Sequence, residues 1–426
     1  MQTITLAMSV DDIIGKVQNA VWGWPLIILI LAAGVWLTVR TGFVQVRHLG
    51  KALKFMVKNE DNGEGEVTSF GALCTALSAT IGTGNIVGVA TAICLGGPGA
   101  LLWMLLAAFF GMATKYSEGF LAIKYREKKD DSHYLGGPFY YIEKGMGSKW
   151  KWLAKLFAVF GICVGLFGIG TFTQINGIAT AVQDFFDPES AHVAFTLFGN
   201  DYTWATVIGG LVVTLCVALV VLGGIQRIAK VSQVIVPFMA ITYVVFALVI
   251  VLGHITAIPA AVKLICQSAF DPQAALGAAT GVTIKLAMQK GIGRGIFSNE
   301  AGLGSTPHAH ALAKVKRPQD QGAVAILGVF IDTFVVLTLT GLVLITSGLV
   351  PQGLTGTALT QAAFSQAFGG FGPVFIAVCM FFFAFSTIIG WYFFGQSNFK
   401  ALFGEKLLPV YSVIVVAFIL VGSTLK

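Results

Sequence analysis

Ten stretches of about 20 mostly apolar residues follow one another along this chain of 426 residues, and they constrain its fold more than any other feature. With 56% hydrophobic and only 11% charged residues, the chain does not suit a soluble core, whereas a bilayer can cover such stretches. Because lipid offers no partner to backbone polar groups, each stretch is predicted to be a helix. The expected membrane helices are residues 21–39, 68–95, 100–123, 156–183, 203–223, 231–252, 283–313, 322–348, 372–397 and 408–425.

The basic residues alternate between successive connections. Segments 40–66 and 124–155 are rich in Lys and Arg, whereas segments 184–202 and 349–371 contain neither. The positive-inside rule therefore predicts an extracellular N-terminus, cytoplasmic basic loops and a multi-pass protein of the cell membrane. The net charge of +7 then reflects topology and contact with lipid headgroups, so it gives no reason to expect nucleic-acid binding.

Two of the apolar stretches do not suit an uninterrupted helix. Residues 78–86, Ser-Ala-Thr-Ile-Gly-Thr-Gly-Asn-Ile, combine two glycines with four polar side chains at membrane depth. Residues 291–305 place five further glycines around a short Phe-Ser-Asn run. Interrupted helices are typical of secondary transporters, which bind small solutes at the interruption.

The two interrupted helices are the second and the seventh, and they run in opposite directions. This arrangement indicates an inverted five-plus-five repeat within a single transmembrane domain, with the first helix as an extra element. The first repeat is expected over residues 68–252 and the second over 276–425. Five helices from the second break require an eleventh, and the sequence ends after the tenth, so we expect the last helix of the second repeat to be missing.

Four motifs are long and unusual enough to be specific: Ala79–Ile86, Leu95–Gly99, Phe110–Tyr116 and Phe297–Ser305. They closely resemble motifs of the sodium:alanine/glycine symporter family, and the similarity extends over nearly the whole chain. The resemblance implies an all-α, leucine-transporter-like fold with one additional helix at the front. It also implies a secondary transporter rather than an enzyme, without a cofactor, that takes up alanine or glycine together with sodium.

A zwitterionic amino acid needs partners for its carboxylate and for its ammonium group. The amides of Thr83 and Gly84 begin the outer half of the second helix and carry partial positive charge, so they are our candidates for the carboxylate. Backbone carbonyls of the seventh helix, with the side chains of Ser298 and Asn299, are candidates for the ammonium. The resemblance points to the same residues.

Three more residues enter the candidate substrate site through the resemblance. Gln174 in the fourth helix would contact the substrate, and Phe297 and Trp391 would form apolar walls that leave room only for a short side chain. From the residues alone, Gln174 could instead hydrogen-bond to another helix, and Trp391 could be a packing or lipid-facing residue.

Sodium is a small, hard cation that favours oxygen ligands. By its resemblance to the leucine-transporter fold, the chain would bind sodium through backbone carbonyls of the second and ninth helices and two hydroxyls of the ninth. The residues are Ser78, Ile81, Phe383, Ser386 and Thr387. The alternative is that the two hydroxyls bond only to carbonyls of their own helix.

Asp332 lies well inside the eighth helix, and acidic residues at such depth are functional by default. We regard it as a candidate for coupling, acting through Arg294 or Lys290 or as a protonated carboxyl group. It keeps a proton-coupled amino-acid carrier as the nearest alternative function; an uncoupled facilitator is the other. Lys115 and Glu118, three residues apart on the third helix, are predicted to form a structural pair.

Overall fold

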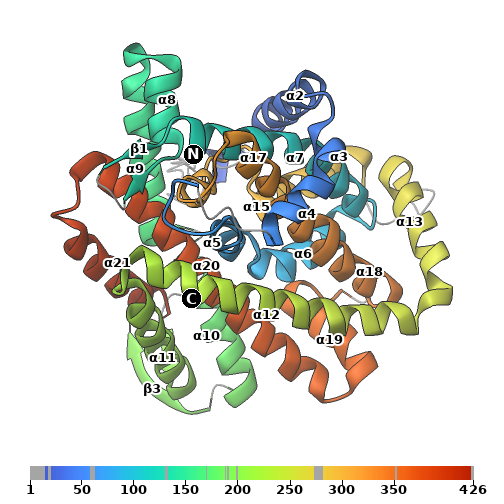
Figure 1. The fold of residues 1–426 in the computed structure, drawn as a ribbon. Helices are drawn as coiled ribbons and strands as arrows, with labels where there is room; N and C mark the ends of the chain where they lie inside the picture. The colour runs from blue at the N-terminus through green and yellow to red at the C-terminus, as the bar shows by residue number, and fades with distance from the viewer. Residues whose placement is uncertain are drawn as a thin grey trace, which may run out of the picture.

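The computed structural model describes residues 15–17, 21–57, 63–129, 133–168, 170–187, 189, 191–197, 200–272, 282–350 and 353–423. Helices dominate this part of the chain (Figure 1). The strands of the described residues form two antiparallel hairpins, β1 (Glu127–Lys128) with β2 (Tyr134–Leu135) and β3 (Val193–Leu197) with β4 (Asn200–Thr203).

All ten predicted membrane segments are helical. Among the residues that the structure describes, six helical segments are long and apolar enough to cross a membrane and a bent pair makes a seventh, whereas Trp24–Arg40 and Leu408–Gly422 are shorter apolar helices. The helices in the predicted ranges are α2 (Trp24–Arg40), α5 (Ser69–Thr80), α6 (Val87–Gly96), α7 (Ala100–Lys124), α9 (Lys151–Phe167), α10 (Phe172–Phe186), α11 (Trp204–Val221), α12 (Gly224–Gly253), α15 (Ile284–Asn299), α16 (Pro307–His310), α17 (Pro318–Val329), α18 (Thr338–Thr346), α20 (Phe371–Phe403) and α21 (Leu408–Gly422).

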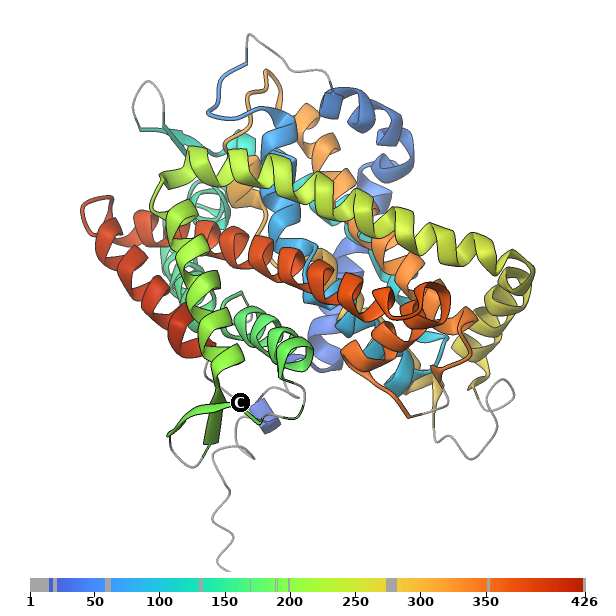
Figure 2. The same ribbon diagram turned by 90° about the horizontal axis from the view of Figure 1, so that it is seen from below.

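The outer helices present apolar side chains to their surroundings, as lipid contact requires. Four apolar residues of α11 recur at helical spacing, and the exposed fraction of each lies between 50% and 62%: Ile208, Leu211, Leu215 and Leu219. The long α12 and α20 run across the molecule close to each other (Figure 2).

The connections between membrane segments contain short elements that the hydropathy pattern did not predict. Two helices, α3 and α4, follow the first membrane helix, α8 precedes α9, and α13 and α19 occupy two later connections. Their bounds are α3 (Val44–Arg47), α4 (Leu49–Val57), α8 (Pro138–Met146), α13 (Ile258–Phe270) and α19 (Gly356–Phe368), with one-turn 3₁₀ helices η2 (Ser148–Trp150) and η3 (Ile255–Ala257).

The predicted break of the second helix is confirmed. Helix α5 ends at Thr80 and α6 begins at Val87, with a single 3₁₀ turn, η1 (Thr83–Asn85), between them. The axes of the two halves differ by 64°. The fourth predicted helix, residues 156–183, lies within one candidate membrane span, Ser148–Gln183, which is divided into α9 and α10.

The second predicted break is shorter than the glycines suggested. Gly291, Gly293 and Gly295 all lie within α15, which continues to Asn299; the interruption covers residues 300–306, where Glu300, Gly302 and Gly304 have left-handed φ angles of 56°, 89° and 74°. At Gly291 a Cβ atom would lie 2.4 Å from the carbonyl oxygen of Ala100, so this glycine permits close packing of α15 on α7. Glycines in the sequence therefore could not show by themselves whether a helix packs closely on another helix or is interrupted.

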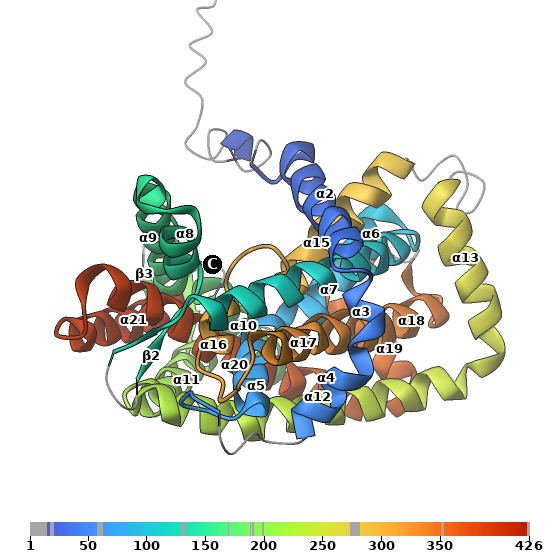
Figure 3. The ribbon, with the colours of Figure 1, turned by 45° about the horizontal axis from the view of Figure 1, so that its top comes forward.

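The centre of the molecule is built from both broken helices and the helices that pack on them. Helix α7 contacts both α15 and α17 (Figure 3), and α5 packs against α12 and α20. Between α17 and α18 the chain forms a π-helical segment, η5 (Phe330–Leu337), in place of regular α-helix. Such π segments are rare and frequently occur at functional sites.

Candidate functional site

The break between α5 and α6 is held open by its own side chains. Ile81 and Gly82 adopt extended backbone conformations, and the Asn85 side-chain oxygen accepts a hydrogen bond from the Gly82 amide at 2.9 Å. A Cβ at position 82 would lie 2.5 Å from the Thr387 hydroxyl, so only glycine lets the break lie against α20. The sequence thus specifies both the interruption and the helix on which it packs.

The five residues expected to bind sodium lie where α5 meets α20. The hydroxyls of Ser386 and Thr387 donate to the Phe383 carbonyl at 3.0 and 2.9 Å, and the Thr387 hydroxyl is 3.5 Å from the Ile81 carbonyl oxygen. Ser78 lies beside Gly390, one turn further along α20. Both hydroxyls therefore bond to a carbonyl of their own helix, as the alternative interpretation of the sequence expected. They do so beside oxygen atoms of both α5 and α20.

The amides of Thr83 and Gly84 begin η1, so they have no acceptor within that turn. Gly84 is partly exposed, although its two neighbours are buried. Among the described residues, no atom lies within 4 Å of the position that a Cβ would take at Gly84. The protein therefore leaves open space beside two unpaired amides at the positive end of a short helix, which suits a carboxylate.

Gln174 does contact the break. The Thr83 hydroxyl donates to its side-chain oxygen at 3.0 Å, and both residues are buried. Gly177, one turn along α10, faces the Thr83 methyl group at 3.6 Å and Met380 at 3.9 Å, measured from an ideal Cβ. The hydrogen bond between helices that the sequence left open is thus present, and it joins α10 to the break.

The two aromatic residues expected as walls are placed differently. Trp391 is buried against Gly170 at the break between α9 and α10, four residues before Gln174, where a Cβ would lie 2.3 Å from the indole. Phe297 packs its ring on Trp22, with centroids 6.1 Å apart, and lies under the Arg294 guanidinium. Trp391 is therefore tied to the helix that carries Gln174, whereas Phe297 contacts the segment preceding α2.

Asp332 lies in the π segment and connects the two broken helices. Its carboxylate accepts a hydrogen bond from the Asn85 side-chain amide at 2.6 Å, and the Ser298 hydroxyl is 3.0 Å from both carboxylate oxygens. Thr333 donates to the same carboxylate at 2.8 Å and accepts from Asn299 at 3.1 Å. Every residue of this cluster is buried. One carboxylate thus bonds to a side chain from each helix break.

The partners expected for Asp332 were wrong. Arg294 is exposed and lies over the ring of Phe297, and the hydrogen-bond donors around the carboxylate are neutral amides and hydroxyls. A π segment shifts the register of the following residues, and the hydropathy pattern carried no sign of it. This shift explains why sequence spacing could not identify the neighbours of Asp332.

The sequence correctly predicted that Lys115 and Glu118 pair. Their charged atoms are 3.8 Å apart and both side chains are buried. Glu118 also accepts a hydrogen bond from the Gly304 amide at 3.0 Å, and Glu300 accepts one from the Ser305 hydroxyl. The pair therefore holds the irregular turn that follows α15. The sequence analysis missed Glu300, although its position directly after Asn299 was a usable signal.

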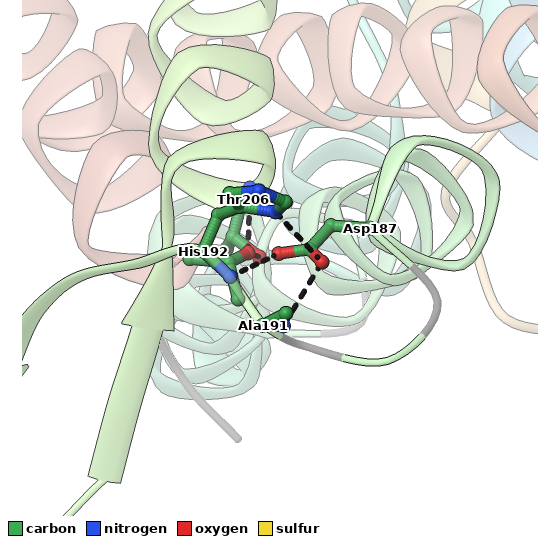
Figure 4. Close-up of polar contacts among 5 residues, drawn as sticks. Asp187, Ala191, His192 and Thr206 are labelled. Atoms are coloured by element: carbon green, nitrogen blue, oxygen red, sulfur yellow. Dashed lines mark hydrogen bonds and ion pairs between the residues drawn. The ribbon is translucent and has the colours of Figure 1, made fainter.

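The end of α10 is fixed by a cap outside the membrane helices (Figure 4). The carboxylate of Asp187 accepts from the backbone amides of Ala191 and His192 at 3.0 and 3.1 Å. Burial would raise the pKa of Asp187, but these amides and the His192 ring outweigh it and hold the pKa below its usual range. The cap anchors the helix that positions Gln174.

The model of the sodium:alanine symporter family matches residues 7–426, nearly the whole chain. The chain belongs to the sodium:alanine symporter family. Its members are transporters rather than enzymes, in agreement with the sequence analysis. The family resemblance inferred from four motifs is therefore confirmed over the full length.

Individual members of the family are closely similar to this chain. The sodium/alanine symporter AgcS of Methanococcus maripaludis is 43% identical over 423 residues, which cover 97% of this chain and 88% of AgcS. The amino-acid carrier protein AlsT of Bacillus subtilis is 36% identical over 414 residues, which cover 97% of this chain and 83% of AlsT.

The fold is shared with a solved transporter structure. The crystal structure of MhsT in complex with L-phenylalanine matches with a TM-score of 0.57 over 84% of this chain and 80% of the MhsT chain. The sequences are only 15% identical, so the likeness concerns the fold alone. It supports the expected leucine-transporter-like architecture of a membrane protein with several apolar helices.

Proposed function

We propose that this protein takes up alanine or glycine together with sodium ions by alternating access. The observation that carries the proposal is the break at residues 81–86. On one side of it, backbone and hydroxyl oxygens of α5 and α20 gather; on the other side, open space lies beside Gly84. AgcS, a sodium/alanine symporter that is 43% identical to this chain, supports the same substrate and ion.

The substrate carboxylate would bind the amides of Thr83 and Gly84, whose partial positive charge complements it. The Gln174 side chain, already bonded to the Thr83 hydroxyl, would complete this end of the site. The ammonium would face the end of α15, where Ser298 and Asn299 lie. Trp391, which packs at the α9–α10 junction, would limit the site to a short side chain, whereas Phe297 packs on Trp22.

Sodium would bind between α5 and α20, with oxygen ligands from Ser78, Ile81, Phe383, Ser386 and Thr387. The hydroxyl oxygens of Ser386 and Thr387 retain lone pairs when their protons point to the Phe383 carbonyl. Because Ile81 and Thr83 belong to the same short break, the ion would favour the backbone geometry that binds the substrate. Such shared geometry gives coupling only if both ligands prefer the same state.

Asp332 supports a second candidate, a carrier coupled to protons. A buried carboxylate among neutral donors can exist in either protonation state, and it contacts both helix breaks. In the symport proposal the same residue would act by holding the two breaks together. The two candidates differ in whether a proton gradient alone supports accumulation.

The proposed orientation places the N-terminus outside and the basic segments in the cytoplasm, in the cell membrane. Within it, residues 68–252 and 276–425 would form the inverted repeats. Their breaks, α5–α6 and α15–α16, would then lie opposite each other across Asp332.

Uptake of labelled alanine into proteoliposomes tests the proposal. An inward sodium gradient should drive accumulation, and replacing external sodium by potassium should abolish it. An inward proton gradient imposed without sodium should be ineffective. Accumulation that survives sodium removal but needs the proton gradient would favour the second candidate; equilibration without accumulation under either gradient would indicate a facilitator.

A further inference from the structure

A cavity separate from the helix breaks lies where α8, the beginning of α9 and the end of α20 meet. Its volume is about 420 Å³. It is lined by five lysines and two glutamates, which leaves an excess of three positive charges around it. The lysines are Lys129, Lys144, Lys151, Lys155 and Lys400.

Not all of this positive charge is neutralised by the protein. Lys144 pairs with Glu127 at 3.0 Å, Lys151 with Glu143 at 2.7 Å, and Lys400 with Glu405 at 3.4 Å. Lys129 and Lys155 are exposed, and within the described residues neither forms an ion pair with a carboxylate. The cavity thus presents two free ammonium groups whose charge an anion could compensate.

The floor of the cavity is rigid and partly apolar. Phe139 and Tyr140 of α8 are buried in a small apolar cluster with Ala154 and Ala158 of α9. Burial, followed by the charges of nearby glutamates, raises the pKa of Tyr140 above its usual range. The Tyr140 hydroxyl therefore keeps its proton and can serve as a donor.

The position of the cavity relative to the bilayer follows from two tryptophans. Trp150 and Trp152 flank Lys151 at the start of α9, stack with centroids 6.3 Å apart, and are 41% and 60% exposed. Exposed tryptophans at the end of a membrane helix are typical of the membrane–water interface. The lysines beside them are therefore at the level of lipid headgroups.

We propose that this cavity binds a phosphate group, and that the phosphate belongs to an anionic phospholipid of the cytoplasmic leaflet. Lys129 and Lys155 supply the free positive charge, and Lys400 reaches the cavity from α20. Basic pockets between membrane helices on the cytoplasmic side suit such headgroups. A phosphate held there bridges α9 to α20, the helix that also carries Ser386 and Thr387, and so stabilises their relative position.

Thermal unfolding of the detergent-purified protein, titrated with phosphatidylglycerol or phosphatidylcholine, tests the proposal. Phosphatidylglycerol should raise the unfolding temperature and phosphatidylcholine should not. The double variant K129Q/K155Q should need about 25-fold more phosphatidylglycerol for the same stabilisation, since a lysine near a membrane surface contributes about fivefold. The matched variant K51Q/K54Q removes two exposed lysines of α4, outside the cavity, and should titrate like the wild type.

Parallel titrations with glycerol 3-phosphate and inorganic phosphate distinguish the source of the phosphate. Stabilisation by these soluble anions at the concentrations that suffice for phosphatidylglycerol, lost in K129Q/K155Q, would overturn the lipid assignment and leave a site for free phosphate. Equal responses of K129Q/K155Q and the wild type to phosphatidylglycerol would overturn the site altogether. Should the double variant fail to fold, the single variant K155Q carries the test, with an expected shift of about fivefold.

Discussion

The side-chain amide of Asn85 donates to the carboxylate of Asp332 at 2.6 Å, across 247 residues of sequence. Asn85 also accepts from Gly82 and so shapes the first helix break. Because Ser298 at the second break bonds to the same carboxylate, a change at either break is transmitted to the other through Asp332. This connection joins the two broken helices through one buried carboxylate, in addition to the direct packing of α15 on α6.

Replacing Asp332 by Asn should abolish concentrative uptake of alanine, reducing the initial rate at least tenfold. The change replaces one acceptor oxygen by an NH2 donor, so at least one of the buried groups that donate to Asp332 loses its acceptor, and each unsatisfied group costs about 1–3 kcal/mol. Uptake in proteoliposomes as a function of pH is the measurement, with Asp332→Glu beside it. If Asp332 acts by holding the two breaks together, both D332N and D332E should take up little alanine at every pH. Wild-type uptake by D332N under a sodium gradient would show that the carboxylate is dispensable.

Replacing Gly84 by Ala should impair transport without impairing folding. The structure has room for the added methyl group, but the methyl would occupy the open space beside the break. The matched control is Gly88→Ala on α6, where the structure also has room. We expect G84A to lose at least nine tenths of its alanine uptake at an unchanged unfolding temperature, and G88A to keep its uptake. Wild-type uptake by G84A would remove Gly84 from the substrate site.

Replacing Gln174 by Ala should weaken alanine binding by about tenfold, the effect of losing about 1.4 kcal/mol of interaction. Gln183 offers a control on the same helix, since it accepts from Thr206 at 2.8 Å rather than from the break. Isothermal titration of both purified variants with alanine measures the difference. The prediction fails if Q174A and Q183A bind alanine equally well.

Replacing Thr387 by Ala should raise the sodium concentration needed for half-maximal uptake at least tenfold, because it would remove one of the five oxygen ligands proposed for sodium. Ser397→Ala is the control, since Ser397 lies on the same helix and bonds only to the Phe393 carbonyl among its recorded partners. The measurement is alanine uptake against external sodium at fixed ionic strength. An unchanged sodium dependence in T387A would place the ion elsewhere.

The cap at Asp187 should make stability depend on pH in the acid range. Its pKa is lowered in the folded protein, so its contribution is present above the unfolded-state pKa of about 3.9 and is lost as the pH falls through the folded value. Asp187→Asn should therefore lower the unfolding temperature at pH 7, and the difference from the wild type should shrink below about pH 4. A difference that stayed constant over this range would show that the charge of Asp187 does not matter.

The sequence by itself determined most of the apolar helices, the first helix break and the family. Apolar length is a local property, because each membrane helix satisfies its own backbone hydrogen bonds and needs no distant partner. For the same reason Gly82, Thr83 and Asn85 could be recognised as an interruption from their neighbours alone. The pairing of Lys115 with Glu118 followed from helical spacing.

Only the tertiary structure decided what each polar group bonds. The neighbours of Asp332 come from two helices distant in sequence, so Asn85 and Ser298 could not be identified as its partners from the sequence alone. The glycines of α15 read as a break because packing on α7 and backbone interruption both favour glycine. Hydrophobic patterning places a residue in the membrane, but the identity of its hydrogen-bond partner depends on how helices from opposite ends of the chain come together.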